Sequence, residues 1–228
     1  MTKFKAVLSD IDGTLADSEG LALKAFQKVC TQLGAEMSHE EADTYIGVAL
    51  EDKFEQVRHR FDQDIEFDAF FERILAHYHL NADEITIFPG ARELLKDSHA
   101  AGMRVGAVTN ANALEADIKI QELGDEITDI LEFTIAVEDI ARPKPAPDGY
   151  LEGARRMGID PKDIIVFEDT RGGVAAAKAA GMTVIQIQPD DSLVNDNADL
   201  VVSSIDDPAI AKFMGLPPKP APATGPKI

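Results

Sequence analysis

The chain has 228 residues, of which 45% are hydrophobic and 28% are charged, proportions typical of a globular protein and unlike those of a disordered chain. Its 41 acidic and 22 basic residues give a formal charge of −19, which opposes binding to nucleic acid or to an anionic membrane. An anionic substrate would therefore need a local positive site, most simply a metal ion together with a lysine.

The single cysteine, Cys30, lies in a helical pattern and cannot form an internal disulfide, so we expect it to fill a core. The N-terminal residues lack the pattern of a signal peptide. No stretch approaches the length of about 18 apolar residues that a membrane span requires. We therefore expect a cytoplasmic location and no membrane partner.

The first half of the chain is predicted to hold one strand and then helices. Residues 4–9 are short and apolar, which predicts a buried strand, and an Asp-Gly turn follows them. From Asp17 to about Leu80 the pattern has a helical period, without a convincing strand. Helices are predicted at residues 19–34, 38–46, 50–61 and 66–80.

After the Pro89-Gly90 turn, predicted helices and strands alternate along the chain. The helices are predicted at residues 91–101, 112–123, 147–157 and 171–180. The strands are predicted at residues 104–109, 133–137, 164–168, 183–188 and 200–202. Such alternation predicts a parallel sheet with helices on both faces.

The N-terminal strand has no partner within the helical stretch, so we expect it to join the later sheet. The predicted fold class is therefore α/β, with a Rossmann-like parallel sheet core and an inserted all-helical cap domain. Residues 1–15 and 89–214 would form the core, and residues 16–88 the cap. Residues 215–228 are rich in proline, which predicts an exposed and mobile tail.

In open α/β sheets, ligands bind outside the carboxyl ends of the strands. The first predicted strand ends in Asp10 and Asp12, followed by Gly13 and Thr14. Along an extended segment the two carboxylates would lie on one side. Gly13 permits the backbone to turn so that its amides can face an anion. This segment is therefore a candidate site for chemistry on an anionic group.

Two further strand ends add polar side chains. Thr109 and Asn110 precede a helix whose free amides could hold a phosphate, although such residues are more often simple N-caps. Lys144 follows the next strand, and the prolines on both sides of it fix the backbone there. A lysine held in this way suits a charge that must point in one direction.

Glu168 and Asp169 end a strand whose other residues are apolar enough to be buried. Two adjacent carboxylates at such a position repel each other and need a cation nearby. Together with Asp10 they would form an oxygen-rich cluster of the kind that Mg²⁺ prefers. The sequence thus predicts both the metal ion and the lysine that an anionic substrate would require.

These motifs, in this order and at these strand ends, resemble the four motifs of the haloacid dehalogenase superfamily. The resemblance extends over essentially the whole chain except the tail. The helical insert and the Lys144-Pro145-Ala146-Pro147-Asp148 segment are similar in particular to the phosphoglycolate phosphatase and β-phosphoglucomutase-like branch. The matching motifs are Asp10-Ile11-Asp12-Gly13-Thr14-Leu15, Thr109-Asn110, Lys144-Pro145 and Glu168-Asp169.

The resemblance implies a role for each of these residues. Asp10 would be the nucleophile that forms an aspartyl-phosphate, and Asp12 would protonate the leaving oxygen and then activate water. Lys144 would support Asp10, which makes it the third catalytic residue. Mg²⁺ would be held by Asp10, the backbone carbonyl of Asp12, Asp169 and the nearby Glu168. Substrate would be bound by Gly13, Thr14, Thr109, Asn110, Lys144 and, from the cap, Arg73.

The predicted function is a Mg²⁺-dependent phosphomonoester hydrolase, a phosphatase acting on a small phosphorylated metabolite such as a sugar phosphate or phosphoglycolate. A sugar-phosphate mutase is the nearest alternative, but Ala22 and Val48 stand where its pattern has a histidine and an arginine. Dehalogenases lack an acid at the position of Asp12. A phosphoacceptor signalling domain would have no cap. We expect a monomer without nucleic-acid partners.

Overall fold

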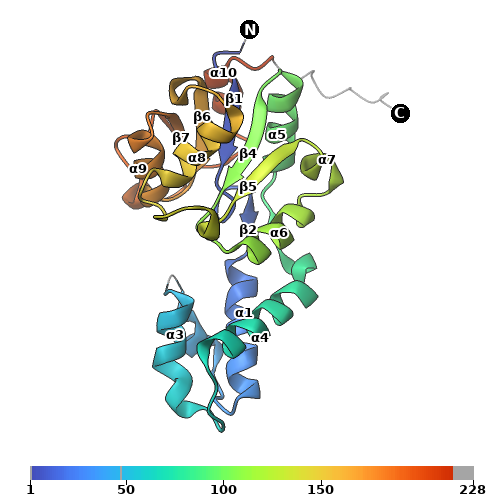
Figure 1. Cartoon of the computed structure of the whole chain (residues 1–228), viewed down its shortest axis with the longest axis vertical. Coiled ribbons are helices and arrows are strands. Elements are labelled where there is room, and N and C mark those ends of the chain that lie inside the picture. Colours follow the sequence, from blue (N-terminus) through green and yellow to red (C-terminus); the bar gives the residue numbers. More distant parts are fainter. Residues whose placement is uncertain (1, 47, 218–228) are drawn as a thin grey trace, which may run out of the picture.

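The computed structural model describes residues 2–46 and 48–217, and its centre is a parallel sheet of six strands (Figure 1). The order of the strands across the sheet is β5-β4-β1-β6-β7-β8. Strand β1 therefore lies in the middle, although it is the first in the chain. The strands are β1 (Ala6–Ser9), β4 (Arg104–Val108), β5 (Leu131–Ile135), β6 (Ile164–Glu168), β7 (Thr183–Ile187) and β8 (Leu200–Val202).

The central strands are buried because helices cover both faces of the sheet. Along β1, Val7 packs into the core on one face, whereas Ala6 and Leu8 pack into the core on the other. This alternation follows from the two-residue period of a strand. One face is covered by α5 (Ala91–Ala100), α6 (Ala113–Glu122), α7 (Asp125–Thr128) and α10 (Pro208–Met214), and the other by α8 (Asp148–Met157) and α9 (Arg171–Ala179).

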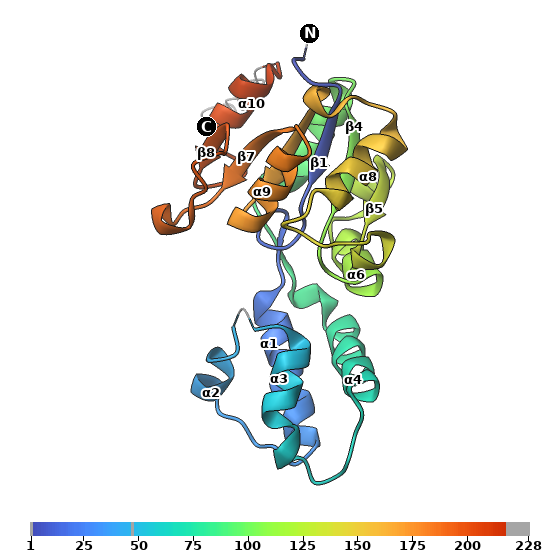
Figure 2. The same cartoon turned by 60° about the vertical axis from the view of Figure 1, so that its left-hand side comes forward.

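Four of the helices that lie between β1 and β4 in sequence form a separate cluster (Figures 1 and 2). Aromatic rings fill its core, with the rings of Phe54 and Phe70 5.1 Å apart. Cys30 is buried in the same core, as expected, and burial raises its pKa to about 12. The helices are α1 (Glu19–Gln32), α2 (His39–Asp43), α3 (Leu50–Val57) and α4 (Phe67–Leu80).

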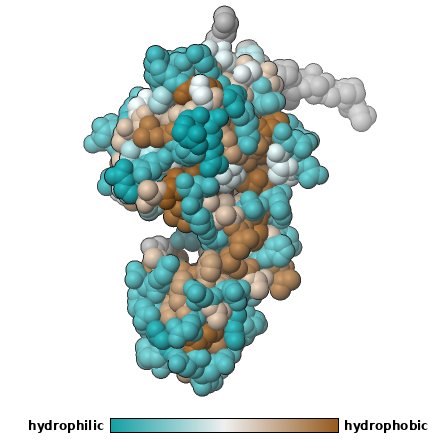
Figure 3. All heavy atoms as spheres, in the orientation of Figure 1, coloured by the Kyte–Doolittle hydropathy of each residue, from teal (hydrophilic) through white to brown (hydrophobic). Residues whose placement is uncertain are grey.

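Two short strands join the helical cluster to the sheet, and they were not predicted from the sequence. Strands β2 (Ala16–Asp17) and β3 (Thr86–Ile87) pair in antiparallel fashion. Each has only two residues, which is too short to show a period of alternation. A small apolar cluster at this junction includes Leu21 and Tyr78, and Figure 3 shows hydrophobic residues at the waist of the molecule.

The fold class predicted from the sequence is confirmed, whereas several element bounds differ. Strand β5 begins and ends two residues before its predicted bounds, because residues 137–139 form a 3-10 turn. The short helices α7 and α10 were not predicted. The predicted mobile tail lies mostly outside the described residues. No helix in the described ranges is long and apolar enough to cross a membrane.

Candidate active site

The polar strand ends meet beside the carboxyl end of β1. Because β1 lies between β4 and β6, Asp10 has the end of β4, which Thr109 follows, on one side and Glu168 on the other. Asp10 is 7% exposed, and its backbone N–H donates to the carbonyl of Phe167 at 3.0 Å. This is the arrangement expected where parallel strands end at one edge of a sheet.

Lys144 reaches into this group of carboxylates. Its Nζ lies 2.5 Å from Asp10 Oδ1 and 2.6 Å from Glu168 Oε1, and it also donates to the carbonyl of Val108 at 2.8 Å. The side chain is only 7% exposed. Burial alone would lower the pKa of Lys144, but Asp10 and Glu168 together raise it above its usual value. Lys144 is therefore a fixed positive charge at the centre of the site.

Burial also acts on the carboxylates that surround Lys144. It raises the pKa of Asp10 well above the usual range, against the opposing charge of Lys144. Burial and then the charge of Glu168 raise the pKa of Asp169 to about 6. One oxygen from each of Asp10, Glu168 and Asp169 lies within 4.8 Å of the others. Three acidic groups this close need more positive charge than one lysine supplies.

Glu168 is fully buried, and protein groups bind both of its carboxylate oxygens. Oε1 accepts hydrogen bonds from Lys144 and from the Tyr150 hydroxyl at 2.8 Å, while Oε2 accepts from the Thr170 hydroxyl at 3.1 Å. A Cβ atom added at Gly173 would lie 1.9 Å from the carboxyl carbon of Glu168, so only glycine leaves room there. The Glu168 carboxylate is thus held in place, with Oε1 fixed against Lys144.

The loop after β1 also packs tightly on Asp169. Gly13 has a φ of 80°, and a Cβ atom there would lie 2.2 Å from Asp169 Oδ2. The neighbouring Thr14 is buried, and its hydroxyl donates to Asp169 Oδ1 at 3.4 Å. Glycine is therefore required both by the backbone conformation and by the close carboxylate.

The side chain of Asn110 forms hydrogen bonds with the loop that carries Lys144. Its Oδ1 accepts from the Lys144 N–H at 2.9 Å, and its Nδ2 donates to the Lys144 carbonyl at 3.2 Å. Both ends of its amide thus fix the backbone of Lys144. The neighbouring Thr109 is buried, and its hydroxyl accepts from the N–H of Ala111 at 3.0 Å.

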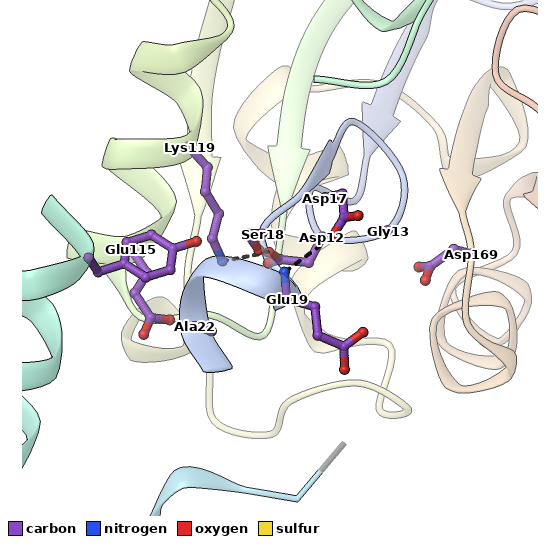
Figure 4. Close-up of a pocket in the computed structure, with 10 residues that line it drawn as sticks. Asp12, Gly13, Asp17, Ser18, Glu19, Ala22, Glu115, Lys119 and Asp169 are labelled. Atoms are coloured by element: carbon purple, nitrogen blue, oxygen red, sulfur yellow. Dashed lines mark hydrogen bonds and ion pairs between the residues drawn. The ribbon is translucent and has the colours of Figure 1, made fainter. Parts of the chain in front are cut away.

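Asp12 contacts two residues that were not predicted to belong to the site. Ser18 Oγ donates to Asp12 Oδ1 at 2.5 Å, and Lys119 Nζ lies 2.6 Å from the same oxygen (Figure 4). Lys119 is 4% exposed. In the sequence, Glu115 and Lys119 resemble an ordinary surface pair on a helix. No local signal reveals that Lys119 points toward Asp12.

Two cavities lie beside these residues. One, of about 200 Å³, is lined by Asp10, Thr109, Lys144 and the turn at Thr170. The other, of about 340 Å³, lies between the sheet edge and the start of α1, where Lys119 and Tyr78 contribute to its wall. Asp12 and Asp169 line both cavities. A phosphoryl group in the first cavity would therefore place the rest of a substrate in the second.

The predicted substrate residue Arg73 lies apart from these cavities. It is exposed on α4, and within residues 2–46 and 48–217 no hydrogen bond or ion pair connects it with the site. Tyr78, further along the same helix, lines the larger cavity instead. The helical period explains the difference, because residues five apart lie on different faces.

The donor set at the sheet edge suits Mg²⁺, which binds carboxylate, carbonyl and water oxygens. Asp10 and Asp169 have oxygens that Lys144 does not occupy, whereas both oxygens of Glu168 already accept hydrogen bonds. A carboxylate oxygen that accepts a hydrogen bond keeps a second lone pair, so the residues present fit a magnesium ion held by Asp10 and Asp169 with Glu168 beside them. Glu168 would contribute by charge and through Lys144.

A family model of haloacid dehalogenase-like hydrolases matches residues 7–187. The chain therefore belongs to this family, and the superfamily inferred from the motifs is confirmed. Hexitol phosphatase A of Escherichia coli (strain K12) is 31% identical over 91% of this chain and 94% of that protein. A crystal structure of CbbY from Rhodobacter sphaeroides in complex with phosphate has the same fold, with a TM-score of 0.77 and 24% identity over 90% of this chain and 96% of that chain.

Other relatives are much longer than this chain. The Arabidopsis thaliana protein SUPPRESSOR OF QUENCHING 1, chloroplastic, is 32% identical over 82% of this chain, which spans 18% of that protein. The bifunctional riboflavin kinase/FMN phosphatase of the same plant is 28% identical over 93% of this chain, which spans 56% of that protein. The relatives named as phosphatases support the enzyme class predicted from the sequence.

Proposed function

We propose that the protein is a Mg²⁺-dependent phosphomonoester hydrolase that acts on a small phosphorylated metabolite through an aspartyl-phosphate. The observation that carries this proposal is the buried Asp10, held 2.5 Å from Lys144 at the end of the central strand. Asp12 follows two residues later, at the boundary of the two cavities. A nucleophile and a proton donor would thus both line the space for a phosphoryl group.

In the first step, an oxygen of Asp10 attacks phosphorus and forms the aspartyl-phosphate. The bond between phosphorus and the substrate oxygen breaks, and its electron pair stays on that oxygen, which takes a proton from Asp12. In the second step, water attacks phosphorus while Asp12 accepts a proton from it. Inorganic phosphate leaves and the Asp10 carboxylate is restored.

Lys144 allows a dianionic phosphoryl group to approach Asp10. Its ammonium neutralises part of the charge of Asp10 and Glu168, and it lines the smaller cavity. Magnesium, when bound, would supply further positive charge against the phosphoryl oxygens. Thr109 would bind the phosphoryl group, Gly13 and Thr14 would shape the site through their contacts with Asp169, and Asn110 would act by fixing the Lys144 loop.

We further propose that residues 16–88 act as a cap over the catalytic core formed by residues 1–15 and 89–214. The four helices share a core of their own, and the paired strands β2 and β3 lie where the chain passes to and from the sheet. Two linkers of this kind are suited to a hinge, and movement there would open and close the larger cavity.

The names of the relatives support a small phosphorylated substrate, because they include hexitol phosphatase A and (DL)-glycerol-3-phosphatase 2. A β-phosphoglucomutase-like activity is the second candidate, since a putative β-phosphoglucomutase from Thermotoga maritima shares the fold, with a TM-score of 0.77 and 22% identity. Ala22, which lines the larger cavity, offers no group to hold a sugar intermediate there. The cytoplasmic location, the monomeric state and the absence of nucleic-acid partners remain predictions.

The test is release of inorganic phosphate from a panel of phosphomonoesters, with Mg²⁺ and after chelation. The panel contains glycerol 3-phosphate, hexose phosphates, phosphoglycolate and p-nitrophenyl phosphate. Hydrolysis that needs both Mg²⁺ and Asp10 is expected. Conversion of glucose 1-phosphate into glucose 6-phosphate, in the presence of a trace of the bisphosphate, would instead identify a mutase.

A further inference from the structure

Lys119 is a buried cation that the proposed reaction leaves without a role. It extends from α6, and its Nζ lies 2.6 Å from Asp12 Oδ1, as Figure 4 shows. The Lys119 side chain is 5% exposed, whereas that of Asp12 is 37% exposed. A buried ammonium is costly unless a counter-charge stays beside it. The pair is therefore unlike the exposed ion pairs elsewhere on the molecule.

The surroundings of Lys119 hold its ammonium in place. Glu115 precedes it by one helical turn, and burial raises the pKa of Glu115 while the charge of Lys119 opposes that rise. The ring of Tyr78, from α4, lies 5.8 Å from the Lys119 Nζ. Acidic groups and an aromatic face thus surround the ammonium.

The contacts of Asp12 are directed to one side of its carboxylate. Lys119 and Ser18 both bind Oδ1, and no hydrogen bond to Oδ2 exists within the described part of the chain. Oδ2 is therefore the oxygen left to exchange a proton with the substrate. Ser18 caps α1 without a side-chain hydrogen bond to that helix, so its hydroxyl serves Asp12 instead.

We propose that Lys119 is a positioning residue that holds Asp12 in the orientation needed to protonate the leaving oxygen. This inference rests on the proposed phosphatase function and assigns a further residue to the same site. Lys119 lines the larger cavity together with Asp12, but not the smaller cavity with Asp10 and Lys144. Lys119 is therefore expected to affect protonation of the leaving group and not the binding of the phosphoryl group.

The chemistry of the leaving group separates this role from a general structural one. An alkoxide is a poor leaving group, so cleavage of an alkyl phosphate needs the proton that Asp12 delivers. The p-nitrophenolate ion is stable without protonation, so its release depends little on Asp12. The ratio kcat/KM reports on steps up to release of the alcohol, before water attacks the aspartyl-phosphate. Comparing kcat/KM for the two substrates thus isolates the step in which Asp12 acts as an acid.

The experiment compares Lys119→Met, which keeps the apolar stem, with wild type on glycerol 3-phosphate and p-nitrophenyl phosphate in Mg²⁺. If glycerol 3-phosphate is not hydrolysed, the best alkyl phosphate of the panel replaces it. We expect kcat/KM for the alkyl phosphate to fall about 10- to 100-fold, the size of effect that misplacement of a catalytic group produces. The value for p-nitrophenyl phosphate should change less than about threefold, and Lys119→Arg should recover much of the loss.

Lys178→Met is the matched control, because Lys178 pairs with Asp199 at 2.8 Å on another core helix. Lys178→Met should leave kcat/KM unchanged for both the alkyl phosphate and p-nitrophenyl phosphate. Equal losses on the two substrates, or no loss on either, would overturn the role of Lys119. If Lys119→Met does not fold, as judged by circular dichroism, Lys119→Gln provides the same comparison. Failure of wild type to release phosphate from any substrate would instead contradict the proposed function.

Discussion

Two buried lysines each form an ion pair with a carboxylate in this protein, one from a loop and the other from a helix. Lys144 lies in a proline-bounded loop and contacts Asp10 at 2.5 Å, while Lys119 lies inside a helix and contacts Asp12 at 2.6 Å. Their side chains are 7% and 5% exposed. The first contact is built at the meeting point of strand ends, and the second depends on how α6 packs. Two similar ion pairs can therefore differ greatly in how well the sequence predicts them.

The largest expected effect comes from removing the negative charge that pairs with Lys144. Asp10→Asn should lower kcat about 10³-fold or more, because a carboxamide cannot form the aspartyl-phosphate. Phosphate release with saturating substrate measures the loss. Asp64→Asn, at a side chain that is 93% exposed, is the control and should keep full activity. Activity of Asp10→Asn above a tenth of wild type, in a folded protein, would remove Asp10 from this role.

Removal of the metal tests the acidic cluster on the Asp10 side of the site. Chelation is expected to reduce activity at least about 100-fold, because the acidic cluster then has only Lys144 to balance it. Added Mg²⁺ should restore the rate, and Ca²⁺ should not, since its larger and looser coordination shell misplaces the nucleophile. Unchanged activity after exhaustive chelation and dialysis would contradict the metal site.

Replacing Lys144 tests whether the two lysines act on different parts of the substrate. Lys144→Met should lower kcat/KM about 100-fold for alkyl and p-nitrophenyl phosphates alike, because Lys144 faces the phosphoryl space that both share. Lys119→Met, in contrast, is expected to lower kcat/KM mainly for the alkyl phosphate. A thermal unfolding curve for Lys144→Met checks that the variant is folded. A selective loss in this variant too would mean that the two lysines are not functionally distinct.

Two buried tyrosines provide the smallest and most closely matched comparison. The Tyr150 hydroxyl donates to Glu168 at 2.8 Å, whereas the Tyr78 hydroxyl lies near Ser18 but makes no well-aligned hydrogen bond within the described residues. Tyr150→Phe should lower the free energy of unfolding by about 1–2 kcal/mol, because it leaves Glu168 with one donor fewer. Tyr78→Phe should change it by less than about 0.5 kcal/mol. Chemical denaturation of both variants measures the difference, and an equal effect would contradict these contacts.

Much of the fold could be predicted from local pattern. The bounds of β6 and β8 agree with the prediction, and α4 begins one residue later than expected. The hydrophobic pattern of each of these elements can be recognised within a few neighbouring residues. Strands β2 and β3 were missed because each contains only two residues, and their pairing joins Ala16 to Ile87 and Asp17 to Thr86, which are far apart in the chain. The roles of the candidate site residues remain predictions that the experiments above address.

The amino-acid sequence alone was sufficient to identify the superfamily, the α/β architecture and the acidic, threonine and lysine side chains at the strand ends. Each of these depends on residue types that are close together in the chain. Packing between distant elements placed Lys119 against Asp12, engaged both oxygens of Glu168 and left Arg73 apart from the cavities. The direction in which a helical side chain points depends on the elements that pack against the helix, and its own neighbours in sequence do not specify them.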